Sequence, residues 1–69
     1  MKTIGQRIRE KRIKLGLKQW QLGDKIGVSQ QVVCHWEKDL HVPTLFMAVD
    51  IADALRCSLD ELVGREVEL

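Results

Sequence analysis

Two short segments joined by one glycine constrain the fold of this chain most strongly. The first segment ends at Ile26, directly before Gly27, which accepts the left-handed backbone angles of a sharp turn. Ser29, a residue type that caps helices well, opens the second segment. In that segment Val33 and Trp36 are three residues apart and share one helical face. The pattern predicts two short amphipathic helices with a tight turn between them.

The same pattern decides which side chains point outward. Gly23, a small residue in the first helix, allows the two helix axes to approach closely. If Val33 and Trp36 face inward, the helix that starts at Ser29 must turn its other side chains toward solvent. The outward side chains are Gln30, Gln31, Cys34 and His35. This arrangement is typical of a helix-turn-helix, whose second helix reaches base edges in the DNA major groove.

Further helices are expected around this pair. The five expected helices cover about residues 4–15, 18–26, 29–37, 45–55 and 59–63, with Thr44 and Ser58 as caps. In the first, Ile4, Ile8 and Leu15 share a face; in the fourth, Leu45, Ala48, Val49, Ala52 and Leu55 are expected inward. The fold class predicted is all-α, a compact five-helix domain over residues 1–64. Residues 65–69 form a tail, either a short strand or disordered.

Length and composition narrow the classes of function. The 69 residues suffice for one domain and leave little room for a deep catalytic pocket. The longest apolar run, Leu45 to Val49, is far shorter than the roughly 20 residues of a membrane span. No signal peptide is recognisable at the N-terminus, so a cytoplasmic location is expected.

Charge is distributed unevenly along the chain, although the formal net charge is only +1. Residues 1–38 carry nine Lys or Arg and three acids, a net charge of +6, whereas residues 39–69 carry two Arg and seven acids, a net charge of −5. A chain divided in this way can present a basic face to a polyanion such as DNA.

The order of several landmarks resembles the Cro/cI-type helix-turn-helix proteins, the lambdoid phage repressors and their bacterial relatives (the Xre family). The landmarks are residues 12–19 (Arg-Ile-Lys-Leu-Gly-Leu-Lys-Gln), Leu22, Gly27-Val28-Ser29, Trp36-Glu37, Pro43, Ala52 with Leu55, and residues 58–62 (Ser-Leu-Asp-Glu-Leu). The resemblance implies a lambda-repressor-like fold. It implies a sequence-specific transcriptional regulator, a repressor in most such proteins, that reads a palindromic operator in double-stranded DNA.

Site residues follow from the resemblance by position. The resemblance assigns base contacts to Gln30, Gln31, Cys34 and His35. An amide such as that of Gln30 offers one donor and one acceptor, which match N6 and N7 of adenine. Phosphate contacts fall to Gln19, helped by the backbone N–H groups at the helix start, and to Lys18, Lys38 and Thr44.

A buried ion pair is also implied, between Arg12 in the first helix and Glu37 at the end of the recognition helix. Some residues depart from the family's usual pattern. Gly23 replaces an alanine at a cost of about 1 kcal/mol in helix propensity. Asp39 replaces a glycine after the recognition helix, so the loop that follows is expected to differ in shape. These departures leave the expected fold intact.

Two further expectations concern partners and cofactors. Phe46 and Met47 fall outside the expected inward face of their helix, and an exposed apolar pair often marks an interface. We therefore expect a two-fold homodimer that uses the region from Phe46 to the tail. The spacing of Cys34, His35, His41 and Cys57 matches no zinc template, so neither a metal nor a cofactor is expected.

Two other classes of function remain as alternatives. The helix-turn-helix could serve as a scaffold for protein contact, such as an antitoxin that binds its partner chain. An enzyme is the third class, and it is disfavoured because no Ser/His/Asp arrangement, carboxylate pair or phosphate-cradling glycine loop is recognisable.

Overall fold

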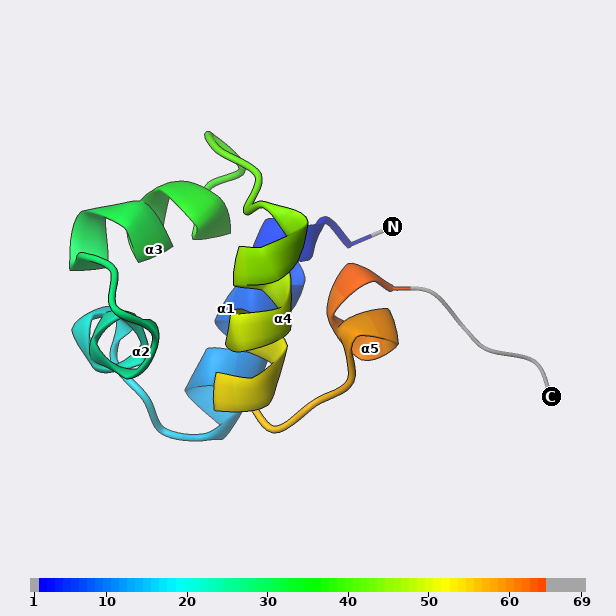
Figure 1. Ribbon diagram of the computed structural model, residues 1–69, viewed down its shortest axis with the longest axis horizontal. Coiled ribbons are helices and arrows are strands. Elements are labelled where there is room, and N and C mark those ends of the chain that lie inside the picture. Colours follow the sequence, from blue (N-terminus) through cyan, green and yellow to red (C-terminus); the bar gives the residue numbers. More distant parts are fainter. Residues whose placement is uncertain (1, 65–69) are drawn as a thin grey trace, which may run out of the picture.

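Five helices account for the regular structure of the described residues (Figure 1). The computed structural model describes residues 2–64, and the predicted tail lies outside them. The helices are α1 (Ile4–Lys14), α2 (Gln19–Ile26), α3 (Gln30–Glu37), α4 (Leu45–Ala54) and α5 (Leu59–Val63). No strand occurs in the described part of the chain, so the all-α prediction is confirmed.

The helix starts are fixed by local side-chain hydrogen bonds. Thr3, Ser29, Thr44 and Ser58 each accept a hydrogen bond from the backbone N–H three residues later. Thr3 also forms a full capping box, because Gln6 Oε1 accepts the Thr3 N–H at 2.9 Å. At α2 the side chain of Gln21 accepts the N–H of Lys18 at 2.8 Å. Each helix therefore starts close to the residue that the sequence indicated.

Each of the five helices contributes side chains to the core. Its buried side chains are Ile8, Leu22, Val33, Trp36, Ala48, Ile51, Ala52, Leu55 and Leu62. α2 packs against α3 and α4, α1 packs against α3 and α5, and α4 also packs against α5. In Figure 1, α2 and α3 lie on one side of α4 and α5 lies on the other. Both ends of the helix-turn-helix are thus supported by the rest of the domain.

Two predicted inward faces were partly wrong. In α4 the exposed residues include Leu45 and Val49, whereas Ile51 is fully buried. The first turns of α4 are apolar on all sides, so periodicity alone could not orient the helix; its contacts with both α2 and α5 do so. Leu15 was also expected inward, but α1 ends at Lys14, and Leu15 is the exposed C-cap residue.

Gly23 and Asp39 show why two positions depart from the family's usual residues. A Cβ added to Gly23 would lie 2.5 Å from the carbonyl oxygen of Val28, so glycine permits this close approach. Asp39 adopts the left-handed φ of +60° that glycine would otherwise supply. Its carboxylate accepts hydrogen bonds from Thr3 Oγ1 at 2.7 Å and from the Gly5 N–H at 3.2 Å. Asp39 therefore ties the end of the recognition helix to the start of α1.

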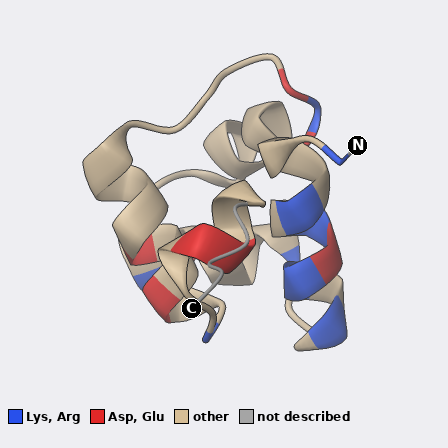
Figure 2. Cartoon of the chain, turned by 90° about the vertical axis from the view of Figure 1, so that its right-hand side faces the viewer, with Lys and Arg blue, Asp and Glu red and all other residues tan. Residues whose placement is uncertain are grey.

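Charge is segregated in space as well as in sequence. Figure 2 shows Lys and Arg gathered along α1, while the acidic residues of α5 lie beside them. One contact between these two elements is the ion pair between Lys11 Nζ and Glu61 Oε2, at 3.4 Å. No helix among the described residues is both long and apolar enough to cross a lipid bilayer.

Candidate nucleic-acid interface

The exposed face of α3 carries the side chains that the sequence assigned to base contacts. Gln30 and Gln31 are exposed, and Cys34 and His35 are partly exposed. On the opposite face, Val33 and Trp36 are buried. The helix therefore holds two amides and an imidazole, all able to donate and accept hydrogen bonds, on its outer side.

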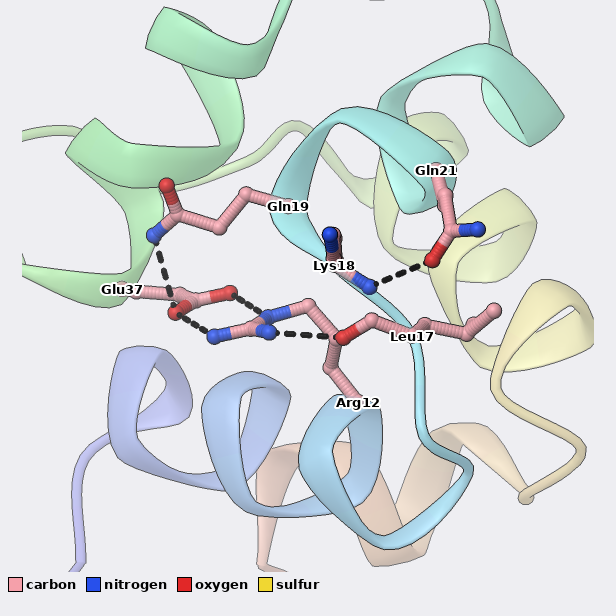
Figure 3. A network of polar contacts seen from close by, with 6 residues as sticks. All are labelled: Arg12, Leu17, Lys18, Gln19, Gln21 and Glu37. Atoms are coloured by element: carbon pink, nitrogen blue, oxygen red, sulfur yellow. Dashed lines mark hydrogen bonds and ion pairs between the residues drawn. The ribbon is translucent and has the colours of Figure 1, made fainter.

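A buried ion pair anchors the end of this helix (Figure 3). Arg12 Nε donates to Glu37 Oε2 at 2.6 Å, and Arg12 Nη2 donates to Glu37 Oε1 at 2.9 Å. The third guanidinium nitrogen, Nη1, donates to the carbonyl oxygen of Leu17 at 2.7 Å. The side chains of Arg12 and Glu37 are only 11% and 3% exposed. This bidentate pair fixes α3 relative to α1 and to the turn before α2.

Gln19 joins the same network from the first position of α2. Its Nε2 donates to Glu37 Oε1 at 3.2 Å (Figure 3). A primary amide has two donor hydrogens and one acceptor oxygen, so this bond leaves Gln19 with further hydrogen-bonding capacity. Both the start of α2 and the end of α3 are thus held by one carboxylate, that of Glu37.

The remaining predicted phosphate contacts lie at helix ends. Lys18 is the exposed N-cap residue of α2, and Lys38 is the exposed C-cap residue of α3. Thr44 is exposed at the start of α4, where its Oγ1 accepts the Met47 N–H at 3.2 Å. That bond leaves the hydroxyl hydrogen of Thr44 able to donate to another acceptor.

Two residues beside the exposed face of α3, His41 and Val32, were not predicted from the sequence to belong to it. His41, in the loop between α3 and α4, lies beside His35, with ring centroids 5.3 Å apart and an interplanar angle of 49°. Val32 is at the margin of the exposed face. The His41 contact has no sequence signal, because the loop conformation that returns the chain toward α3 depends on the left-handed turn at Asp39.

Of the two apolar residues expected outside the inward face of α4, only one is highly exposed. Phe46 is 84% exposed, whereas Met47 is partly buried and packs against the core, so Phe46 faces outward and Met47 lies at the edge of the inward face. The difference has the same cause as the rotated inward face of α4. Exposed apolar side chains instead continue around Phe46 through the preceding loop and the first turns of the helix; we call Leu40, Val42, Leu45, Phe46 and Val49 the apolar patch.

The cysteines and other potential metal ligands do not converge. Cys34 and Cys57 are free thiols, and no group of three or more His, Cys, Asp or Glu suited to a metal ion occurs within residues 2–64. Burial raises the pKa of the Cys57 thiol, and the charge of Lys11 opposes this effect in part.

The comparisons with known proteins define the class of this fold and site. A helix-turn-helix family model matches residues 8–62, and the chain belongs to this family. The resemblance to the Cro/cI-type proteins is thereby confirmed.

Particular relatives are phage repressors. The chain is 39% identical over 62 residues to the cryptic phage CTXphi transcriptional repressor RstR of Vibrio cholerae, covering 90% of this chain and 55% of that protein. It is 37% identical over 60 residues to repressor protein C2 of Salmonella phage P22, covering 87% of this chain and 28% of that protein. The chain thus spans about half of one relative and about a quarter of the other.

A solved structure shows the same fold on DNA. The crystal structure of the P22 c2 repressor in complex with a synthetic operator matches 96% of this chain and 100% of that chain. The TM-score is 0.89 at 33% sequence identity. The lambda-repressor-like architecture predicted from the sequence is therefore confirmed.

Proposed function

We propose that this chain is a sequence-specific regulator of transcription, a repressor, that binds double-stranded DNA with α3 in the major groove. The observation that carries the proposal is that Gln30 and Gln31 are exposed, with His35 partly exposed, on a helix whose other end is fixed by the buried Glu37. A rigid helix loses little conformational freedom on binding, so its side chains can discriminate base edges. The P22 c2 repressor, which is similar over nearly the whole chain, was solved on its operator.

The proposed DNA contacts form two sets, one to bases that gives specificity and one to phosphates that gives affinity. Gln30, Gln31, Cys34 and His35 would face bases, with each amide donating and accepting at an adenine. The second set, Gln19, Lys18, Lys38 and Thr44, would contact phosphates and set the position of the helix in the groove. The proposed role is binding alone, without catalysis, and its location is the cytoplasm, where a phage or bacterial operator lies.

The decisive experiment is selection of bound sites from a random pool of DNA duplexes, followed by titration of the selected operator. Gln31→Ala should weaken binding to that operator by about 1–3 kcal/mol and relax the preference at one base pair. Lys38→Ala should weaken binding to all sequences and reduce the salt dependence by about one unit. Arg9→Ala removes an exposed charge of α1 and serves as the matched control. If selection enriches no sequence, the proposal fails.

We further propose that the chain binds DNA as a two-fold homodimer through the apolar patch. Five large apolar side chains are exposed within residues 40–49, and an exposed apolar cluster often marks an interface. Phe46 stays the central candidate, whereas Met47 would contribute through the packing of α4 instead of direct contact. A dimer would place two copies of α3 about one DNA turn apart, roughly 34 Å, on a palindromic operator.

Sedimentation of the chain, alone and with operator, tests this assembly. Phe46→Asp should abolish dimers and weaken operator binding, whereas Ile13→Asp, at an exposed apolar residue outside the apolar patch, should do neither. A strictly monomeric mass at high micromolar concentration, with and without operator, would overturn the dimer and leave the DNA-binding proposal untouched.

A further inference from the structure

Two adjoining hollows lie on the side of the domain away from α3. They form where the turn between α1 and α2 meets the turn between α4 and α5, along the lower edge of Figure 1. One hollow has a volume of about 130 Å³ and the other about 280 Å³, and both are lined by Leu15 and Arg56. We call the two hollows together the rear groove.

Apolar side chains line the rear groove beside the charged ones. Leu15 and Leu17 contribute from the first turn, and Ala54 and Leu55 contribute from the end of α4. Leu15 is 40% exposed, although an apolar residue that ends a helix beside the core would ordinarily be covered. Leu15 is thus an exposed aliphatic side chain that the two hollows share.

The rim of the rear groove is basic. Lys11 and Lys14 line the larger hollow, Lys25 lines the smaller one, and Arg56 lines both. The only acidic side chain among the lining residues of either hollow is Glu61, whose carboxylate is already paired with Lys11. The other three cations form no ion pair within residues 2–64.

Acidic side chains lie in a further hollow that adjoins the rear groove at Arg56. Beyond it, Asp50 and Asp53 line a more open hollow together with Lys25 and Arg56. The two aspartates would repel an acidic ligand there. Within the rear groove itself, the cations beside Leu15 have Glu61 as the one acidic neighbour among the lining residues.

Backbone hydrogen bonds preform both turns. The Leu17 N–H donates to the Arg12 carbonyl oxygen at 3.1 Å, and the Cys57 N–H donates to the Ala52 carbonyl oxygen at 3.0 Å. Arg56 lies in the left-handed region, at φ +57°, at the corner of the second turn. A surface that is already ordered loses less entropy when a partner binds.

We propose that the rear groove is a docking site for an acidic segment of a partner protein. A leucine-sized side chain of that segment covers Leu15, and flanking carboxylates face Lys14, Lys25 and Arg56. The chemistry follows from the groove, because an exposed leucine among cations without ion-pair partners in the described chain complements alternating apolar and acidic residues. Since α3 faces the other way, a partner can occupy the groove while DNA is bound.

The test is an NMR titration of the whole chain with a synthetic peptide of about ten alternating Glu and Leu residues. We expect the backbone amide signals of Leu15, Leu17 and Arg56 to shift, with binding that weakens at high salt. Lys25→Gln and Arg56→Gln should each weaken the peptide about threefold, the effect of one exposed charge pair. Arg9→Gln makes the same change of charge outside the groove and should leave the affinity unchanged.

Four results would overturn the proposal. They are the absence of shifts at the groove, shifts confined to α3, an equal effect of Arg9→Gln, and equal binding of a peptide of alternating Lys and Leu. Melting curves of each variant separate lost docking from lost folding. Repeating the titration with operator DNA bound tests whether both sites are filled together; displacement of the peptide by DNA would refute independent docking. The outcome does not depend on which DNA sequence α3 recognises.

Discussion

The replacement Glu37→Ala tests how far the recognition helix depends on one buried carboxylate. In the wild-type chain Glu37 accepts two hydrogen bonds from Arg12 and one from Gln19. Alanine removes both carboxylate oxygens, and with them all three hydrogen bonds. The guanidinium of Arg12, 11% exposed, then keeps only the carbonyl oxygen of Leu17 as a partner.

The expected cost is large for a domain of this size. Removing one partner of a buried ion pair destabilises a protein by about 3–5 kcal/mol, mostly because the remaining charge is buried and uncompensated. A domain of this length has a total stability of roughly 4–10 kcal/mol. Since each kcal/mol lowers the melting temperature of a small domain by about 4–8 °C, we expect Glu37→Ala to lower it by roughly 12 °C or more.

Thermal unfolding followed by circular dichroism measures the effect, and Glu10→Ala supplies the control. Glu10 accepts from Lys2 Nζ at 2.7 Å, a distance like that in the buried pair, but both side chains are more than half exposed. An exposed pair of this kind contributes about 0–1 kcal/mol. The comparison therefore isolates burial from ion pairing.

A second variant separates charge from shape. Glu37→Gln keeps an acceptor oxygen for Arg12 and should cost less than Glu37→Ala. Equal melting temperatures for the wild type and Glu37→Ala would refute the argument that this carboxylate holds the domain together. An equal loss in Glu10→Ala would show that burial is not what makes the pair important.

The other predictions concern close packing and titration. Gly5→Ala should destabilise the domain by about 1–3 kcal/mol in denaturant unfolding, because the new Cβ would collide with the carbonyl oxygen of Trp36; a stability unchanged by this substitution would contradict the packing. The hydrogen bond and charge of Lys11 lower the pKa of Glu61, so this pair stabilises the fold above the ordinary carboxyl pKa, and the contribution is lost as pH falls through the lowered value. Melting temperatures of the wild type and Glu61→Gln should therefore differ at pH 7 and converge in acid; a constant difference would refute the assignment. Alkylation of Cys57 by iodoacetamide should show a pH midpoint above that of an exposed thiol, because burial raises its pKa, and a midpoint at or below the ordinary value would contradict this.

The helix-turn-helix was predictable because its signals are local. Ser29 caps its own helix, Gly27 takes the left-handed turn at φ +78°, and Val33 and Trp36 mark one face through their spacing. Each of these residues acts on neighbours within a few positions along the chain. The outward placement of Gln31 follows from the same periodicity.

The orientation of α4 and the links between distant elements could not be predicted in this way. Residues 45–49 are all apolar, so several rotations of the helix bury a similar area, and the choice between them depends on how α2 and α5 lie against it. The spacing therefore left Met47 either outward or at the edge of the inward face, and the packing places it at the edge. The hydrogen bond from Thr3 Oγ1 to the Asp39 carboxylate joins residues 36 positions apart, and no local sequence pattern predicts it.

The sequence by itself determined which segments are helical, where each begins, and which side of the recognition helix is polar, since caps, glycines and apolar spacing act over one or two helical turns. Tertiary structure alone decided which apolar side chains stay exposed, as at Phe46 and Leu15. It also decided which charged side chains have no ion-pair partner among the described residues, as around the rear groove. The physical reason is that exposure and net charge at a surface depend on which elements meet there. Which helices and loops come into contact is decided by the packing of the whole domain.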